Sequence, residues 1–177
     1  IQDIVDDKGK KLMLIDLHTT SASGGCFCIT NTHPRSTELA LQIPVPVING
    51  MTSVISGTTI EYFDQLGLPA IAFEAGQHKE PEAVNRIKAG LVSIFCKTSC
   101  LDSSALAQYQ EDYDKMEHDF SHLPRNVNVL YRHPVEDEDA FVMNEGYTNF
   151  QKISKGELLA QDKNGPIPSP MNGMILM

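Results

Sequence analysis

The sequence predicts an α/β fold, with a mostly parallel sheet and flanking helices, followed by a small all-β unit. Two uninterrupted apolar runs, residues 12–15 and 69–73, are typical of strands that are covered on both faces, as in a parallel sheet. Amphipathic helical patterns follow the second run. After Pro124 the pattern changes to short β segments separated by turns. We therefore divide the chain into domains of residues 1–122 and 123–177.

The first apolar run leads directly into polar residues. Asp16 and His18 follow it, and because side chains alternate along a strand, both are expected to leave on the same side. Open α/β sheets build their sites at the carboxyl ends of strands. Small hydroxyl residues and two glycines come next, at 19–25, so this stretch is predicted to be a loop beside a site.

Shorter elements are expected between the two apolar runs. Residues 26–30 are predicted to form a second strand, and residues 36–42 have a composition compatible with a helix. Prolines at 44 and 46 interrupt any β ladder, which predicts an edge or a loop. A further helix is expected to begin at 58–60 and to stop before 66–69.

The second apolar run also ends on a charge, Glu74. A loop at 75–78 is expected to follow, and Pro81 is placed to start a helix. That helix is predicted to pack one apolar stripe against the sheet, formed by Val84, Ile87, Leu91 and Ile94. Another helix is expected from about Ser103, with the same spacing in Leu106, Tyr109, Tyr113, Met116 and Phe120.

The C-terminal unit is predicted to consist of short β segments. Glycine-containing turns at 155–156, 163–165 and 171–173 separate them. The expected segments are 127–131, 140–143, 148–153, 158–161 and 174–177.

Composition narrows the classes of function. A net charge of −9 over 177 residues argues against a nucleic-acid partner held by phosphate contacts. No apolar run approaches the roughly 20 residues that span a bilayer, and no signal peptide opens the chain. A cytoplasmic protein without a membrane partner is expected. The four cysteines, at 26, 28, 96 and 100, lack the usual zinc-knuckle spacing, so buried reduced thiols are favoured over a metal site.

The two strands are predicted to deliver His18 and Glu74 to the same edge of the sheet. Neutral imidazole is the commonest metal ligand, and its second ring nitrogen needs an acceptor, for which Asp16 has the right type and offset. A glutamate near metal-bound water acts first as general base and then as general acid. The alternative is a structural histidine and a glutamate that caps the next helix.

Three motifs of a known enzyme family occur in the chain, and the first two have the order and spacing expected for it. They are Ile-Asp-Leu-His-Thr-Thr-Ser at 15–21, Phe-Glu-Ala-Gly-Gln-His at 73–78, and a tail that runs from Tyr-Arg-His-Pro at 131 to Met-Asn-Gly at 173. The sequence resembles the succinylglutamate desuccinylase/aspartoacylase family of zinc hydrolases, which are related to the zinc carboxypeptidases. The resemblance implies a zinc-carboxypeptidase-like α/β domain and a barrel-sandwich-like C-terminal domain.

The resemblance also implies roles for individual residues. His18 matches the second histidine of a His/Glu/His zinc site, and Glu74 matches the carboxylate that activates water and protonates the leaving amine. Thr19 would lie near the substrate because it follows the ligand. Tyr147 matches a tyrosine that reaches the site from the β unit, although it is also explained as a half-buried strand aromatic. His78 would line the pocket or merely precede the helix.

Two motifs that precede the second zinc histidine in the family have no counterpart before His18: the first zinc motif, His-x-x-Glu, and an Asn-Arg pair that grips the substrate carboxylate. His133 alone is followed by a glutamate three residues later, and it lies in the tail. Both motifs lie upstream in relatives, and residues 1–5 have the pattern of the last turns of a helix. We therefore expect a fragment that is incomplete at its N-terminus and, since no turn follows 174–177, truncated at its C-terminus.

The function implied by the resemblance is zinc-dependent hydrolysis of the amide bond of an N-acyl amino acid, with Glu74 as general base. One zinc ion is expected, whose other ligands are not in this sequence, so the segment alone should bind zinc weakly and hydrolyse nothing. Pocket-wall residues are expected at 57–62. Two alternatives remain, a biotinyl- or lipoyl-like carrier with Lys163 as acceptor and a non-catalytic family member. A homo-oligomer is compatible with the sequence.

Overall fold

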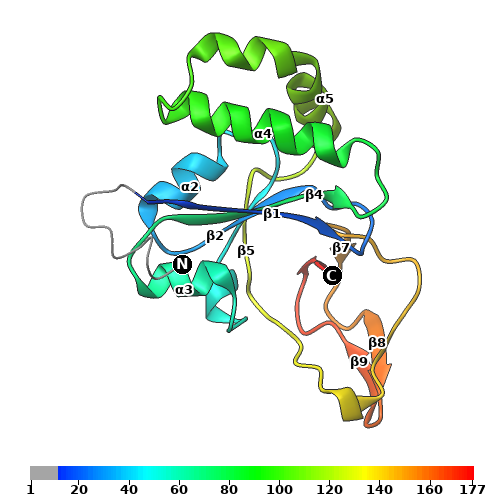
Figure 1. The fold of residues 1–177 in the computed structure, drawn as a ribbon. Helices are drawn as coiled ribbons and strands as arrows, with labels where there is room; N and C mark the ends of the chain where they lie inside the picture. Colours follow the sequence, from blue (N-terminus) through cyan, green and yellow to red (C-terminus); the bar gives the residue numbers. More distant parts are fainter. Residues whose placement is uncertain (1–11) are drawn as a thin grey trace.

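The computed structural model describes residues 12–177, and a five-stranded sheet forms its centre (Figure 1). The strands lie in the order β1 (Leu14–Thr20), β4 (Ala70–Gln77), β2 (Phe27–Thr30), β3 (Val47–Asn49) and β5 (Asn126–Asn128). The pairs β1–β4, β2–β3 and β3–β5 are parallel, and β2–β4 is the antiparallel pair of this sheet. The predicted α/β fold with a mostly parallel sheet is therefore confirmed.

Helices cover both faces of this sheet (Figure 1). One face packs against α2 (Pro34–Ala40), α4 (Ala83–Lys97) and α5 (Gln110–Phe120), which follows the 3₁₀ helix η2 (Ser103–Tyr109). The other face packs against α3 (Thr59–Gln65), which comes after the short 3₁₀ helix η1 (Met51–Ser53). Strand β4 shows the alternation directly. Ile71 and Phe73 pack in the α4-side core, whereas Ala70 and Ala72 pack with α3.

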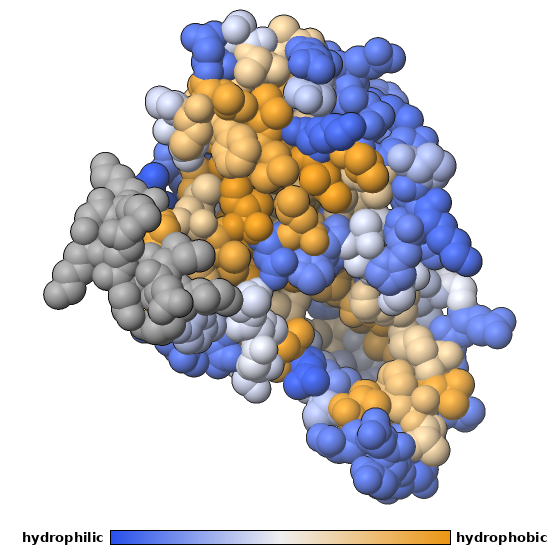
Figure 2. All heavy atoms as spheres, viewed as in Figure 1, coloured by the Kyte–Doolittle hydropathy of each residue, from blue (hydrophilic) through white to orange (hydrophobic). Residues whose placement is uncertain are grey.

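The first strand lies at the edge of the sheet. Its apolar run contacts a core on each face, as predicted, with Met13 and Ile15 on the α4 side and Leu14 on the α3 side. Among residues 12–177, however, β1 pairs only with β4. Residues 12–15 are half-buried and Leu17 is 40% exposed. Apolar side chains gather on the exposed face around α4 and the sheet beneath it (Figure 2). An apolar run indicates a strand, but it does not say whether a neighbour lies on each side.

The buried stripe of α4 is also rotated from its predicted position. Val84 is 58% exposed, and the buried positions are Ala83, Ala89, Gly90, Ser93 and Ile94. A Cβ at Gly90 would lie 2.9 Å from the Phe73 ring and 3.2 Å from Ile43. Because the helix approaches the sheet this closely, small residues form the contact and a branched side chain is turned outward. Ile94 and the Met116 of α5 are buried as predicted.

The C-terminal residues form two small antiparallel sheets. One contains β6 (Val142–Met143), β8 (Leu158–Asp162) and β9 (Gly165–Pro168), and the other pairs β7 (Lys152–Ile153) with β10 (Gly173–Met174). A 3₁₀ helix, η3 (Asp137–Asp139), precedes them. No barrel-sandwich is formed by the residues that the structure describes. Only residues 127–128 of the first segment predicted for this unit, 127–131, are in a strand, and that strand is β5, which joins the larger sheet.

Two further predictions concern the cysteines and membranes. Cys26 and Cys28 are fully buried thiols, and burial raises the pKa of Cys26 to about 12, so neither is reactive. Cys96 and Cys100 are free and more exposed. Within residues 12–177, none of the helices has the length and apolar character needed to cross a membrane. The helix predicted at residues 1–5 lies outside the described residues.

Candidate active site

His18 and Glu74 are opposite each other on neighbouring strands. They are register partners in the parallel β1–β4 pair. Register partners in a sheet project their side chains to the same face. Ala70 and Ala72 of β4 and Leu14 of β1 belong to the core on the α3 side, so the alternation places both site residues on that face as well. The predicted meeting of an imidazole and a carboxylate from separate strands therefore occurs in the structure.

The C-terminal unit packs on the same face beyond the site. Phe27 of β2 is the register partner of Glu74 on the side away from β1. Its ring packs edge-on against Phe150, with ring centroids 5.7 Å apart. Ile29 contacts both this cluster and the α3 cluster. The His18–Glu74 pair thus lies on the sheet face that α3 and the C-terminal unit share.

An irregularity in β4 shapes the strand end directly after Glu74. The register shifts so that Thr20 pairs with Gln77, which leaves one extra residue on β4. Such bulges re-aim side chains and occur next to active sites. Gly76 occupies the bulge with φ of +115°, and a Cβ there would lie 2.6 Å from the guanidinium of Arg86 and from the carboxylate of Glu80. Only glycine fits this conformation and this space.

The bulge brings His78 back to β1. Its backbone N–H donates to the carbonyl of Thr20 over 3.0 Å. Its Nδ1 lies 2.8 Å from Oγ1 of Thr19. Thr19 and His78, two of the three residues that the resemblance places near the substrate, therefore contact each other at the ends of the strands that carry His18 and Glu74.

Asp16 holds the ring of His18. Nε2 of His18 lies 2.8 Å from Oδ1 of Asp16, and the hydroxyl of Thr59 donates to Oδ2 over 2.6 Å. The other ring nitrogen, Nδ1, has no hydrogen-bond partner among the described residues. The His18 side chain is 51% exposed, so Nδ1 is accessible to a ligand. Asp16 thus occupies the orienting position predicted from its offset of two residues.

Glu74 presents one carboxylate oxygen, Oε2, that is buried and has no hydrogen-bond partner in the described part of the chain. Burial raises the pKa of Glu74, and Asp16 raises it further, whereas His18 and His78 act in the opposite direction. For Asp16, burial also raises the pKa, but hydrogen bonds from Thr59 and His18 outweigh it and the net pKa is lowered. The environment therefore shifts the pKa values of two nearby carboxyl groups in opposite directions.

Tyr147 is not part of this cluster. Its hydroxyl donates to Oε1 of Glu157 over 2.8 Å, and this hydrogen bond raises the pKa of Tyr147. The two residues after it do reach the loop that follows β1: Asn149 donates its backbone N–H to Ser23 over 3.1 Å and packs against Gly25. The segment approaches the site while its tyrosine hydroxyl is engaged elsewhere. The substrate-binding role of Tyr147 stays a prediction.

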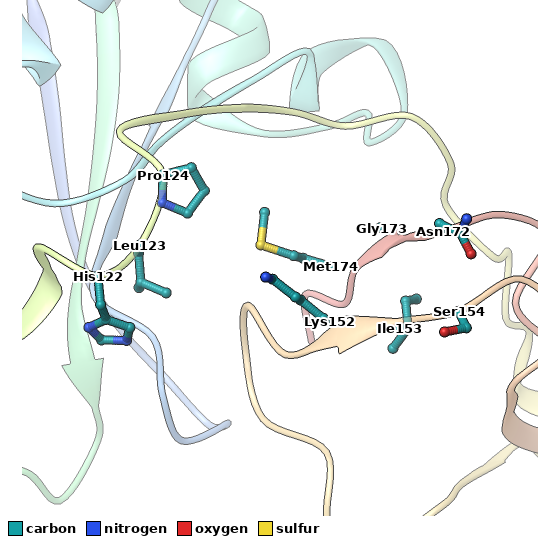
Figure 3. Close-up of a pocket in the computed structure, with 9 residues that line it drawn as sticks. All are labelled: His122, Leu123, Pro124, Lys152, Ile153, Ser154, Asn172, Gly173 and Met174. Atoms are coloured by element: carbon teal, nitrogen blue, oxygen red, sulfur yellow. The ribbon is translucent and has the colours of Figure 1, made fainter.

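A groove of about 820 Å³ lies elsewhere, between the end of α5 and the β7–β10 ribbon (Figure 3). One wall consists of residues 122–124 and the other of 152–154 and 172–174. Met174 and Lys152 extend across it toward Pro124 (Figure 3). None of the predicted site residues lines this groove, so it is separate from the His18–Glu74 pair.

The residues present fit part of a zinc site. His18 offers a free ring nitrogen on an oriented ring, and Glu74 offers a desolvated carboxylate beside it. Within residues 12–177 no three histidine, cysteine, aspartate or glutamate side chains lie close enough together to hold a metal ion. The described residues therefore do not form a complete metal site by themselves. Thr59 was anticipated only as part of a helix start and of the 57–62 pocket wall.

Comparison with known proteins supports the resemblance at the level of the fold. No protein-family model and no curated protein matches the sequence. Solved structures do match: the apo ectoine utilization protein EutE (DoeB) from Ruegeria pomeroyi has a TM-score of 0.57 at 16% identity, covering 93% of this chain and 54% of that one. A succinylglutamate desuccinylase/aspartoacylase from Rhodobacter sphaeroides has a TM-score of 0.56 at 15% identity, covering 90% and 50%.

A succinylglutamate desuccinylase from Vibrio parahaemolyticus has a TM-score of 0.55 at 17% identity, covering 97% of this chain and 50% of that chain. The chain thus has the fold of deacylase structures. More particularly, these structural neighbours are members of the succinylglutamate desuccinylase/aspartoacylase family, which is the family that the motifs indicate. The chain spans about half the length of each of them.

Proposed function

We propose that this chain is part of a zinc-dependent amidohydrolase that cleaves the amide bond of an N-acyl amino acid. The observation that supports this most strongly is the register pairing of His18 with Glu74, whose Oε2 is buried without a partner. Buried polar atoms are normally satisfied, so an orphaned carboxylate oxygen beside a free imidazole nitrogen is the arrangement expected where a ligand and water bind. The names of the structural neighbours, desuccinylase and aspartoacylase, favour acylated amino acids as substrates.

His18 would hold the zinc ion through Nδ1, with Asp16 fixing the ring through Nε2. When bound, zinc would polarise the amide carbonyl and lower the pKa of the attacking water. The remaining ligands would come from outside these 177 residues. Asp16, kept ionised by Thr59 and His18, favours the ring orientation in which Nδ1 is unprotonated and free to coordinate.

Glu74 would move the proton. Its Oε2 accepts a proton from water as the nucleophile attacks, and the same oxygen then protonates the leaving amine nitrogen. A raised pKa suits both steps, because the carboxyl group must gain and lose a proton near neutral pH. We further propose that Thr19 and His78, paired through Oγ1 and Nδ1, bind the substrate beside this carboxylate.

Titration of the 177-residue chain with zinc tests whether these residues hold only part of the metal site. We expect no tight site, because one imidazole and one carboxylate do not make a tetrahedral set. The chain should also leave N-succinylglutamate unhydrolysed. His18→Ala should abolish any weak binding, whereas His118→Ala, a change at an exposed histidine, should not. A sub-micromolar dissociation constant for zinc in the wild-type chain would contradict the proposal.

The coding sequence upstream of Ile1 would distinguish between an enzyme and a non-catalytic family member. We expect it to encode His-x-x-Glu and an Asn-Arg pair. In a protein that contains them, Glu74→Gln should lower kcat by about 100-fold or more while zinc content stays at one ion per chain. Absence of the His-x-x-Glu motif would favour the non-catalytic alternative.

The carrier alternative has a single structural feature in its favour. Lys163 lies in the tight turn between β8 and β9, the kind of hairpin position where carrier lysines are modified. Its Nζ, however, lies 2.9 Å from Oδ1 of Asp139. Intact-mass measurement after co-expression with a biotinyl or lipoyl ligase is expected to show no added mass.

A further inference from the structure

We propose that Thr59 is a positioning residue for His18 and that it acts through Asp16. The inference rests on the proposed function, since it assigns to Thr59 the task of holding the metal ligand in place. Thr59 is 41 residues away from His18 in the sequence and lies on another element, the first residue of α3.

The geometry consists of two hydrogen bonds that share one carboxylate. Thr59 Oγ1 donates to Oδ2 of Asp16 over 2.6 Å, and Oδ1 of the same carboxylate lies 2.8 Å from Nε2 of His18. Leu17 contributes a backbone hydrogen bond to the carboxylate as well. Because each oxygen is engaged from a different direction, the carboxylate cannot rotate without losing a partner. The ring of His18, half exposed and otherwise free to turn, takes its orientation from that carboxylate.

The start of α3 is itself held rigidly, which makes the hydroxyl of Thr59 a fixed donor. Thr58 caps the helix by accepting from the backbone N–H of Glu61 over 3.1 Å, and Oε2 of Glu61 accepts from the N–H of Gly57 over 2.6 Å. One turn into the helix, Ile60 and Phe63 are buried against Ala70 and Ala72 of β4. A helix anchored at its cap and on its apolar face places its first side chain at a constant distance from β1.

This linkage gives the edge strand support that it lacks from a second neighbour. Among the described residues β1 pairs only with β4. The side-chain hydrogen bond from Thr59 to Asp16 connects α3 to β1, the strand that carries His18. The strand that carries His18 and the start of α3 are therefore linked directly.

Acylation of His18 by diethyl pyrocarbonate in the 177-residue chain tests the proposal, and it needs neither zinc nor substrate. The rate is followed by peptide mass spectrometry at about pH 8, where imidazoles are mainly neutral. His118, whose side chain is 90% exposed, provides the internal reference in each sample. Thr59→Val removes the hydroxyl and keeps the shape. We expect the His18 rate to rise about threefold relative to His118, because Nε2 becomes more available to the reagent when Asp16 is held less firmly. The size is that expected for one net hydrogen bond.

Three further variants make the result specific. Thr59→Ser retains the donor and should keep the His18 rate near wild type, which a purely steric role would not predict. Thr52→Val removes a hydroxyl from η1 that makes no hydrogen bond to Asp16 in the described part of the chain, so it should change nothing. Asp16→Ala should raise the rate at least as much as Thr59→Val.

The outcomes are distinguishable from those of the hydrolase proposal. An unchanged His18 rate in Thr59→Val, with the fold retained by circular dichroism, would overturn the role of Thr59. So would an equal rise in Thr59→Ser. Results that contradict the zinc and hydrolysis predictions would remove the enzymatic proposal. They would not affect the expected threefold change in the acylation rate of His18.

Discussion

The two strands that carry the site are built differently although their sequences are similar. Strand β4 lies between two neighbours and buries side chains on both faces, and Phe73 has no exposed surface. Strand β1 lies at the edge, with Leu17 40% exposed and His18 half exposed. The comparison separates the two tasks of the site. The central strand desolvates a carboxylate, which needs burial, and the edge strand presents an imidazole, which needs access.

The largest expected effect is on stability. Phe73→Ala in β4 should lower the free energy of unfolding by about 3 to 5 kcal/mol, because a fully buried ring is lost and the space closes only in part. Leu17→Ala in β1 should lower it by no more than about 1 kcal/mol. Urea unfolding of both variants measures the difference. Equal losses would show that β1 is buried as firmly as β4 and would remove the distinction.

The bulge that follows Glu74 should be the next most sensitive position. Gly76→Ala combines a positive φ with a Cβ that meets Arg86 and Glu80, so we expect a loss of about 2 kcal/mol. Gly146→Ala is the matched control, because φ is +92° there but no atom lies within 4 Å of an added Cβ. Its cost should be the smaller of the two. If Gly146→Ala were the more harmful change, the close contact at the bulge would not matter.

The smallest effects should appear in the pH dependence of stability, with opposite signs on the two strands. The pKa of Glu74 is raised on folding, so its favourable contribution is present below the unfolded pKa of about 4.3 and is lost as the pH rises through the folded pKa. Glu74→Gln should therefore gain stability relative to wild type as the pH increases from 3 to 8. Urea midpoints over this range test the sign.

Asp16 should behave in the opposite way. Its pKa is lowered on folding, so its contribution is present above the unfolded pKa of about 3.9 and is lost as the pH falls through the folded pKa. Asp16→Asn should be destabilised at pH 7 and should approach wild type at the acidic end of the same series. A constant difference across the series would argue against an ionised, hydrogen-bonded Asp16.

Much of the α/β part was predictable from local patterns. Continuous apolar runs predicted β1 and β4, and the alternation of side chains predicted that Asp16 and His18 share a side, as their contact confirms. The helix start at Thr58 was predicted from its residue types and is confirmed by its capping hydrogen bond. These features depend on residues a few positions apart, which is the range over which sequence patterns act.

The C-terminal unit shows where local patterns mislead. Strand β9 contains Pro166 and Pro168 and was not predicted, because proline cannot donate to a ladder. The strand forms because, among residues 12–177, it pairs with β8 alone, so its second side needs no donor. Strand β5 was assigned to the β unit, although its partner is β3, about 80 positions earlier in the chain. Pairing over that distance leaves no trace in a short segment.

By itself, the sequence determined that a histidine and a glutamate would each end an apolar strand, with an acceptor for the imidazole two residues before it. Only the tertiary structure decided that the two strands are neighbours in register, that β1 is an edge, and that Thr59 of α3 reaches Asp16. The reason is physical. Side-chain alternation follows from the backbone of each strand, whereas pairing, desolvation and the separation of the two carboxyl pKa values arise from groups that meet only after folding.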